Sequence, residues 1–445
     1  MSESKRGESK TVFWEIVPGE VCNLKCKNCY AANNVRPDTR ILNWEKLKKL
    51  LDKIIELKVK KIDLLGGEPL LHPCLEKTIK YFSNRVPDGF CGIVTNGTLI
   101  TKEKAKKIKN SGVSQITVSL DGTTPMINDM SRGKGSFKQA IKGIHNAIDA
   151  GIPITISYTI NQFNLENTCD IIPFTQNIGV KAAAVQITDR WGRAIKSMEG
   201  TKFNRIKGLD AVCNMYHSFF IMYTDIATRN MFKNFLNLFY NANLIIKDER
   251  CEGGLHSFLI SSGGDLYPCA SYAYYHDGKQ RNNGVSLVSE SLTTIKKVMR
   301  QYKRFNTTMR DTANKKFTTC RNCSYNNFCA PCPLENPSGG VPECEWVRKQ
   351  TRFLMNKIKK STLKLLIQPT EKNGNLTFTV PTQKQPIHVP MGEKEFRKLI
   401  EASTVSQMIK NVCRDKKESY EKAAYEVIKF LCKLRSHYII RIRNF

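Results

Sequence analysis

Three cysteines lie close together near the start of the 445-residue chain, in the sequence VCNLKCKNCY. They are Cys22, Cys26 and Cys29, with the spacing C-x3-C-x2-C. A structural zinc ion takes four protein ligands, and a cluster of four irons is normally held by four thiolates. Three thiolates on such a cluster would leave one iron free to bind a substrate or cosubstrate. The alternatives are a zinc site, or a [4Fe–4S] cluster that a remote cysteine completes.

The composition indicates a soluble globular protein, with 41% hydrophobic and 25% charged residues. The sequence has no apolar run of membrane-spanning length, and its first residues, MSESKRGESK, lack the apolar segment of a signal peptide. We therefore expect a cytoplasmic protein. Thiols stay reduced there, so clustered cysteines predict metal ligands or catalytic groups rather than disulfides.

The chain is strongly basic, with 70 Lys and Arg against 40 Asp and Glu and a net charge of +30. Such a charge would suit an anionic partner, for example an acidic peptide. The lysines are spread along the chain, however, and many lie on polar helix faces such as KLKKLLDKIIELKVKK. No zinc-finger, basic-zipper or RNA-recognition motif is found, so we do not expect a nucleic-acid partner.

The elements that must position the cysteines alternate between strands and helices. Short apolar runs predict strands at Thr11–Val17, Lys61–Leu65, Cys91–Thr95, Gln115–Leu120, Ile152–Ile160 and Lys181–Ile187. Helical periodicity predicts helices at Trp44–Leu57, Leu75–Ser83, Lys102–Asn110, Ser136–Ala150 and Leu165–Gln176. This order implies a parallel α/β sheet, which is either an open doubly wound sheet or an incomplete (β/α) barrel.

Polar or glycine-rich residues follow each of the first four predicted strands. The cysteine triplet follows the first, LLGGEPL the second, VTNGT the third and VSLDG the fourth. The carboxyl ends of parallel strands meet at one edge of a sheet, where sites are built in either architecture. The sequence therefore predicts a functional site at this edge.

The triplet resembles the signature of the radical S-adenosylmethionine (radical SAM) family, and Gly66-Gly67-Glu68-Pro69 resembles that family's GGEP motif. The resemblance implies an incomplete TIM-type (β/α)6 barrel and a [4Fe–4S] cluster on Cys22, Cys26 and Cys29. It also implies that S-adenosylmethionine binds the free iron and is cleaved reductively to a 5′-deoxyadenosyl radical. Residues 66–69 would hold the amine of the cosubstrate. Taken alone, GGEP could be no more than a tight turn before a helix.

The stretch VSLDGTTPMINDMSRGKGSF resembles the branch of this family that carries extra C-terminal clusters. By this likeness Ser119, Asp121 and Arg132 are candidates to contact the ribose or carboxylate of the cosubstrate. The planar donor fork of an arginine suits a carboxylate. Thr95 and Asn96 could line the same edge. The alternative reading is strand capping for Ser119 and a turn at Asp121-Gly122.

A second group of cysteines resembles the seven-cysteine SPASM domain, which binds auxiliary iron–sulfur clusters. It consists of Cys251, Cys269, Cys320, Cys323, Cys329, Cys332 and Cys344. The resemblance implies two auxiliary [4Fe–4S] clusters. Cys320, Cys323, Cys329 and Cys344 would hold one, and Cys251, Cys269 and Cys332 the other, whose fourth ligand is unidentified. The spacing departs from the family pattern, because two residues rather than three separate Cys329 from Cys332. A zinc ribbon is the alternative.

We predict four segments: a radical SAM barrel at 11–190, a helical connection at 191–250, a SPASM domain at 251–350, and a C-terminal α+β module at 361–445. The module resembles the winged-helix element with which some enzymes bind the leader of a ribosomal precursor peptide, by adding the leader as a strand. A helical extension that only covers the SPASM domain is the alternative.

The predicted function is that of a peptide-modifying maturase, which abstracts a hydrogen atom from a residue of a ribosomal peptide to form a cross-link, thioether or epimer. A small electron-transfer protein would supply the electron. The alternatives are a maturase of a larger protein such as an anaerobic sulfatase, a small-molecule oxidoreductase, and a non-catalytic iron–sulfur or zinc scaffold. The sequence identifies no catalytic acid or base, and we interpret His72, His145 and His256 as structural.

Overall fold

The computed structural model describes the barrel region and parts of the C-terminal half. The described residues are 13–30, 41–180, 182–188, 192–204, 207–208, 211, 225–228, 254–255, 257–274, 284–316, 362–365, 369–372, 375–378, 387–389, 392–400, 404–417, 420, 423, 427, 430–431 and 440–443.

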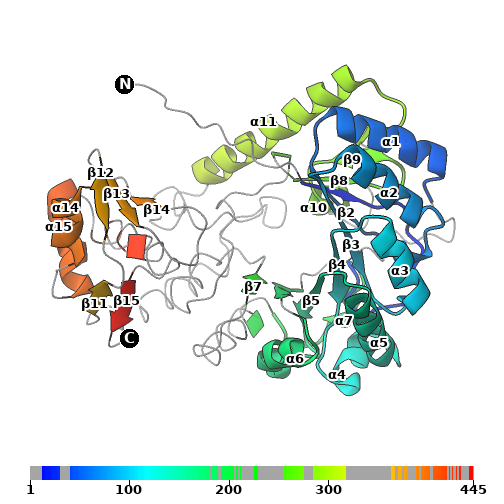
Figure 1. The fold of residues 1–445 in the computed structure, drawn as a ribbon, viewed down its shortest axis with the longest axis horizontal. Coiled ribbons are helices and arrows are strands. Elements are labelled where there is room, and N and C mark those ends of the chain that lie inside the picture. The colour runs from blue at the N-terminus through cyan, green and yellow to red at the C-terminus, as the bar shows by residue number, and fades with distance from the viewer. Residues whose placement is uncertain are drawn as a thin grey trace.

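A ten-stranded sheet forms the centre of the barrel region (Figure 1). Its first seven strands pair with their neighbours in chain order, and every pairing is parallel. They are β1 (Phe13–Ile16), β2 (Lys61–Leu64), β3 (Phe90–Thr95), β4 (Gln115–Ser119), β5 (Ile154–Ile160), β6 (Ala182–Ile187) and β7 (Asp225–Thr228). A doubly wound sheet reverses its strand order at a switch point, and this sheet does not. The prediction of an incomplete (β/α) barrel is therefore confirmed.

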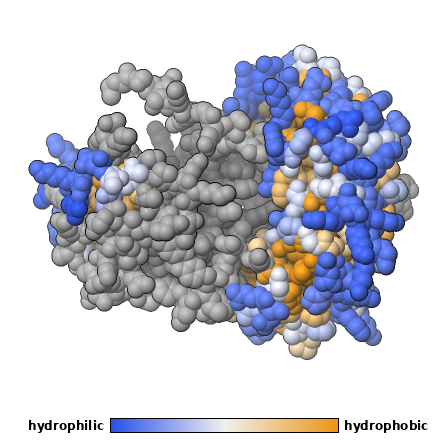
Figure 2. All heavy atoms as spheres, in the orientation of Figure 1, coloured by the Kyte–Doolittle hydropathy of each residue, from blue (hydrophilic) through white to orange (hydrophobic). Residues whose placement is uncertain are grey.

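Helices follow most of these strands and cover one side of the sheet (Figure 1). They are α1 (Trp44–Glu56), α2 (Leu75–Arg85), α3 (Lys102–Asn110), α4 (Pro125–Arg132), α5 (Ser136–Asp149), α6 (Ile171–Asn177) and α7 (Ala194–Ser197), with the 3-10 helices η2 (Pro69–Leu71) and η3 (Leu165–Asp170). The outer surface over these helices is mostly hydrophilic (Figure 2). Their apolar faces bury residues such as Leu47, Ile79, Ile108 and Ile144 against the sheet.

Local rules explain where these helices begin. Asn43 accepts a hydrogen bond from the backbone N–H of Lys46 and caps α1. Thr101 caps α3 through Lys104 in the same way. Both helices start where the sequence predicts. The predicted helix at Leu165–Gln176 is divided between η3 and α6, and α4 lies in a glycine-rich stretch for which no helix was expected.

Strands from the cysteine-rich half extend the same sheet. Strand β8 (Ser257–Ile260) pairs parallel with β1, and β9 (Asp265–Tyr267) and β10 (Val285–Ser286) add antiparallel strands beyond it. The short helix α10 (Ala270–Tyr274) and the long α11 (Leu292–Lys316) follow. The stretch predicted as a helical connection contains β7, which continues the parallel sheet at its other end. The segment boundaries at 190 and 251 stay predictions.

The C-terminal segment has strands and helices of its own. Strand β11 (Thr362–Leu365) pairs with β15 (Ile440–Arg443), while β12 (Thr370–Lys372), β13 (Asn375–Phe378) and β14 (Ile387–Val389) form an antiparallel sheet. The helices α14 (Glu393–Ile400) and α15 (Val405–Lys416) follow. This composition agrees with the predicted α+β module. Within the described part of the chain, no helix has the length and apolar character needed to span a bilayer.

Candidate active site

The loop that follows β1, residues 19–30, carries Cys22, Cys26 and Cys29 and contacts the loops after six other strands of the sheet. We call it the cysteine loop. The three thiols are half-buried. Burial raises the pKa of Cys22 and Cys26, and the other thiols of the triplet lie close enough to add to both shifts. The structure therefore brings the three predicted ligands together at the expected edge.

The GGEP segment holds the first half of the cysteine loop through its backbone. The N–H groups of Gly67 and Glu68 donate to the carbonyl oxygens of Gly19 and Val21, at 3.1 and 2.7 Å. A Cβ atom on Gly67 would lie 2.3 Å from the Val21 oxygen, a distance that real Cβ atoms do not reach. Glycine is thus required here so that two backbone segments can lie side by side.

The carboxylate of Glu68 joins this segment to the end of β3. It is 3% exposed and accepts hydrogen bonds from Leu70 N (3.0 Å), Thr95 Oγ1 (2.6 Å) and Asn96 N (2.8 Å). Burial raises its pKa, while these donors oppose the shift. Asn96 in turn donates to Asn23 Oδ1 at 2.9 Å. Glu68, Thr95 and Asn96 therefore position the Cys22 end of the loop.

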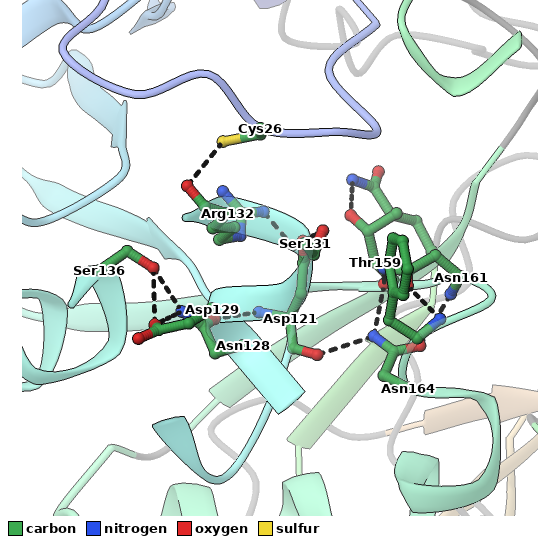
Figure 3. A network of polar contacts seen from close by, with 12 residues as sticks. Cys26, Asp121, Asn128, Asp129, Ser131, Arg132, Ser136, Thr159, Asn161 and Asn164 are labelled. Carbon is green, nitrogen blue, oxygen red and sulfur yellow. Dashed lines mark hydrogen bonds and ion pairs between the residues drawn. The ribbon is translucent and has the colours of Figure 1, made fainter. Parts of the chain in front are cut away.

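A network of polar contacts around Asp121 supports the middle of the cysteine loop (Figure 3). Asp121 Oδ1 accepts from Arg132 Nη2 and Oδ2 from Ser131 Oγ, both at 2.9 Å. The backbone N–H of Asp121 donates to Asn128 Oδ1, and its carbonyl accepts from Asn164 Nδ2. Every polar atom of Asp121 thus has a partner within the protein, and its carboxylate fixes Arg132.

Arg132 lies beside the thiols. The Cys26 Sγ atom is 3.9 Å from the Arg132 carbonyl oxygen (Figure 3), and the guanidinium interacts electrostatically with Cys26 and Cys29. Burial raises the pKa of Cys26 to about 11, and the Arg132 charge opposes this rise. The guanidinium is therefore the positive charge that can stabilise thiolates here. Its Nε atom is buried without a hydrogen-bond partner.

The loops after β5 and β6 contact the last part of the cysteine loop. Gln162 donates to Asn28 Oδ1 at 3.3 Å, and Arg193 Nε donates to the Cys26 carbonyl at 2.7 Å. From the other side, Ser262, which follows β8, donates to the Glu20 carboxylate. None of these three contacts was predicted from the sequence. The only local signal was a glycine–arginine pair after the last predicted strand.

Comparison with known proteins identifies the barrel. Residues 16–174 match the radical SAM superfamily, and this span contains the cysteine loop, the GGEP segment and the Asp121 network. Residues 16–174 form a radical SAM domain. This domain indicates an enzyme, because members of the radical SAM superfamily use S-adenosylmethionine and a [4Fe–4S] cluster.

Several characterised proteins are similar to this radical SAM enzyme. An AdoMet-dependent heme synthase from Oleidesulfovibrio alaskensis is 25% identical over 338 residues, which cover 73% of this chain and 82% of the relative. The antilisterial bacteriocin subtilosin biosynthesis protein AlbA of Bacillus subtilis is 28% identical over 259 residues, which cover 56% of this chain and 53% of AlbA. The structure of Streptococcus suis SuiB bound to S-adenosylmethionine has a similar fold, with a TM-score of 0.58 at 17% identity over 75% of each chain.

The chemistry of the site fits these cofactors. Four buried polar atoms near the carboxyl ends of the strands and on the cysteine loop lack hydrogen-bond partners: Arg132 Nε, Asn28 Nδ2, Gln162 Oε1 and Thr188 Oγ1. A polar cosubstrate would satisfy such atoms. Within the described residues, no three His, Cys, Asp or Glu side chains converge on one point as ligands of a single ion.

The other predicted site residues within the described part of the chain lie in the barrel sheet, in its loops and just before α10. Ser119 ends β4, opposite Ser157 of β5. Gly66 has a φ of +140° and contacts Gly19, and Pro69 begins η2. Cys269 lies just before α10, and its Sγ accepts from Tyr272 N at 3.3 Å. The other predicted SPASM cysteines lie outside the described residues; they are Cys251, Cys320, Cys323, Cys329, Cys332 and Cys344.

Proposed function

We propose that this radical SAM enzyme modifies a residue of a ribosomally made peptide. Cys22, Cys26 and Cys29 would hold a [4Fe–4S] cluster, which would supply one electron to break a C–S bond of S-adenosylmethionine and give methionine and a 5′-deoxyadenosyl radical. The observation that carries the proposal is the cysteine loop itself. Contacts from six other strand ends hold the loop so that its thiols lie beside the buried guanidinium of Arg132.

Each part of the site has a role in this proposal. Arg132 would bind the carboxylate of the cosubstrate through its unpartnered Nε, and Ser119 would contact the same ligand. Asp121 would act through Arg132, since both of its carboxylate oxygens already accept hydrogen bonds. The backbone of residues 66–69 would bind the amine.

The predicted auxiliary clusters remain part of the proposal. Cys320, Cys323, Cys329 and Cys344 would hold one [4Fe–4S] cluster. Cys251, Cys269 and Cys332 would hold the other, with a fourth ligand still to be found. Strands β8 and β9, which precede Cys269, continue the barrel sheet. The cluster that includes Cys269 would thus lie beside the barrel. A small electron-transfer protein would reduce the enzyme.

Two observations support a peptide substrate. AlbA, a bacteriocin biosynthesis protein, is 28% identical over 259 residues. In addition, β12 and β14 each pair on one side only among the described residues of the C-terminal segment. A leader peptide could add a strand at either edge. The net charge of +30 would favour an acidic leader.

A small-molecule substrate is the second candidate. The alignment with the heme synthase covers 82% of that relative, whereas the alignment with AlbA covers 53% of AlbA. This similarity favours an iron tetrapyrrole as the substrate, with the same radical chemistry at the cysteine loop. A maturase of a larger protein is a third outcome, which the test below also distinguishes.

Affinity capture from the native organism tests the choice. Tagged, reconstituted enzyme is incubated anaerobically with cell extract, and the eluate is then treated with S-adenosylmethionine and reductant in deuterated water. We expect a ribosomal peptide whose mass or deuterium content changes only when S-adenosylmethionine is present. A protease-resistant compound with tetrapyrrole absorption that is converted instead would contradict the peptide proposal. A folded protein substrate would also contradict it. The Cys26→Ala variant is the matched control.

A further inference from the structure

In the loop after β6, a single arginine makes hydrogen bonds to the second half of the cysteine loop. Arg193 Nε donates to the carbonyl oxygen of Cys26 at 2.7 Å, and Arg193 N donates to the carbonyl oxygen of Cys29 at 3.0 Å. One residue thus binds the backbone of two cysteines that flank the C-x2-C turn. It reaches them from a position 167 residues further along the chain.

The turn between these cysteines is weakly held by its own backbone. Cys29 N lies 3.4 Å from the Cys26 carbonyl oxygen, which is at the long end for a hydrogen bond. The same oxygen accepts the much shorter bond from the charged Arg193 side chain. Hydrogen bonds from ionised donors are roughly twice as strong as neutral ones. Arg193 is therefore the principal restraint on the orientation of this carbonyl.

Gly192 allows the approach. Its φ of +55° lies in the left-handed region that favours glycine. A Cβ atom at this position would lie 2.3 Å from the Cys29 carbonyl oxygen and 2.5 Å from that of Tyr30. Gly192 and Arg193 therefore both contribute to the contact with the cysteine loop. The glycine removes the steric obstacle, and the arginine makes the bonds.

A second contact holds the same turn from the other side of the barrel mouth. Lys27 N donates to the Ser131 carbonyl at the end of α4, at 2.7 Å. The Cys26–Cys29 turn is therefore held between the end of α4 and the start of α7. The α4 contact binds the spacer residue between the cysteines. Arg193 binds the cysteines themselves: a substitution of its side chain removes the bond to the Cys26 carbonyl, while the backbone bond to Cys29 stays.

We propose that Arg193 is a positioning residue, which fixes Cys26 and Cys29 so that their thiolates can hold the cluster. This inference rests on the proposed function, since it assumes that the triplet binds a [4Fe–4S] cluster. It adds a residue outside the matched span of 16–174 to the cluster-binding machinery.

The test compares full-length wild type, Arg193→Gln and Arg193→Lys after anaerobic reconstitution. The readout is the EPR signal of the reduced cluster that changes when S-adenosylmethionine is added, because this change reports the triplet cluster and not the auxiliary ones. We expect an iron chelator to remove this signal roughly tenfold faster or more in Arg193→Gln, given the usual strength of charge-assisted bonds. Arg193→Lys should lie between, since an ammonium keeps the charge without the planar donor fork.

The controls separate cluster positioning from folding. Arg300→Gln, on the exposed face of α11, removes an arginine far along the chain and should match wild type. Cys26→Ala gives the level at which the triplet cluster is absent. The melting temperature of the iron-free variants should equal that of iron-free wild type. A lower melting temperature in both Arg193 variants would overturn the inference, because the contact would then serve the fold.

Two further outcomes are decisive. If Arg193→Gln keeps the wild-type EPR signal and chelator resistance, the inference is wrong while the proposed function stands. If wild type itself shows no EPR change with S-adenosylmethionine, then the proposed function fails first and the inference fails with it.

Discussion

At the scale of single residues, the charged side chain of Arg132 interacts both with Asp121 and with the thiols. Its guanidinium is paired with the buried Asp121 on one side and lies beside Cys26 and Cys29 on the other. The pair is well shielded, with side-chain exposures of 14% and 5%. Asp121 thus orients the guanidinium of Arg132. The charge of this guanidinium favours the thiolate form of Cys26.

Asp121→Asn should weaken the binding of S-adenosylmethionine, although we do not propose that Asp121 itself contacts this cosubstrate. The substitution keeps the shape of the side chain but removes the ion pair, so Arg132 loses its fixed orientation. We expect the dissociation constant for S-adenosylmethionine, measured by anaerobic equilibrium dialysis, to rise roughly tenfold. The free energy of unfolding should fall by about 3 kcal/mol, as is usual when one partner of a buried pair is removed.

Asp129→Asn is the matched control for that prediction. Asp129 accepts from Gly135 N and Phe137 N at the start of α5 but does not contact Arg132. Its variant should lose stability while keeping wild-type affinity for S-adenosylmethionine. Equal affinities for Asp121→Asn and wild type would show that Asp121 does not orient Arg132.

At the scale of elements, the site depends on one loop bound by the ends of many strands. The positions of β2 and α3 followed from local patterns, since alternation fixes a strand and Thr101 caps a helix. The same local patterns placed the cysteines and GGEP at one edge. They could not show that β8 pairs with β1, or that Arg193 reaches Cys26. Those contacts join distant parts of the chain and depend on the completed sheet.

The segment η2 is joined to the start of α1 through His72, and this contact predicts a pH dependence. His72 is buried; its Nδ1 accepts from Cys74 N at 3.1 Å, so its Nε2 carries the proton and donates to the Leu42 carbonyl at 3.0 Å. Burial lowers its pKa from the ordinary value of 6.5. Below that value the unfolded chain binds a proton that the folded protein does not. Stability should therefore be lost as the pH falls below 6.5, by at most about 1.4 kcal/mol per pH unit.

Urea unfolding of the iron-free protein at pH 7.5, 6.0 and 5.0 measures this dependence. His72→Gln should flatten the slope, whereas the same substitution at the exposed His145 of α5 should leave it unchanged. A slope that is the same in wild type and His72→Gln would refute the assignment.

At the scale of the whole molecule, the barrel is stabilised without the cysteines. Its core is made of aliphatic and aromatic side chains between the sheet and the outer helices, such as Trp14, Ile62, Phe82, Ile116 and Ile156. Backbone hydrogen bonds to neighbouring loops hold the cysteine loop. Neither the core nor these hydrogen bonds requires a cluster, so we expect the barrel to fold without its cofactors.

Removal of iron should accordingly leave the barrel folded. We expect the chelated protein to keep its far-UV circular dichroism and a cooperative melting transition, while all cleavage of S-adenosylmethionine is lost. Loss of the transition upon chelation would mean that a cluster, and not the apolar core, stabilises the barrel.

The central claim is that the three thiols of the cysteine loop support radical chemistry. Its most direct test is anaerobic chromatography of 5′-deoxyadenosine formed from S-adenosylmethionine and reductant. Wild type should form this product. Cys22→Ala, Cys26→Ala and Cys29→Ala should each form none, while Cys91→Ala, which changes a buried core cysteine of β3, should retain activity. Product formation by any of the three triplet variants, or none by wild type, would contradict the account.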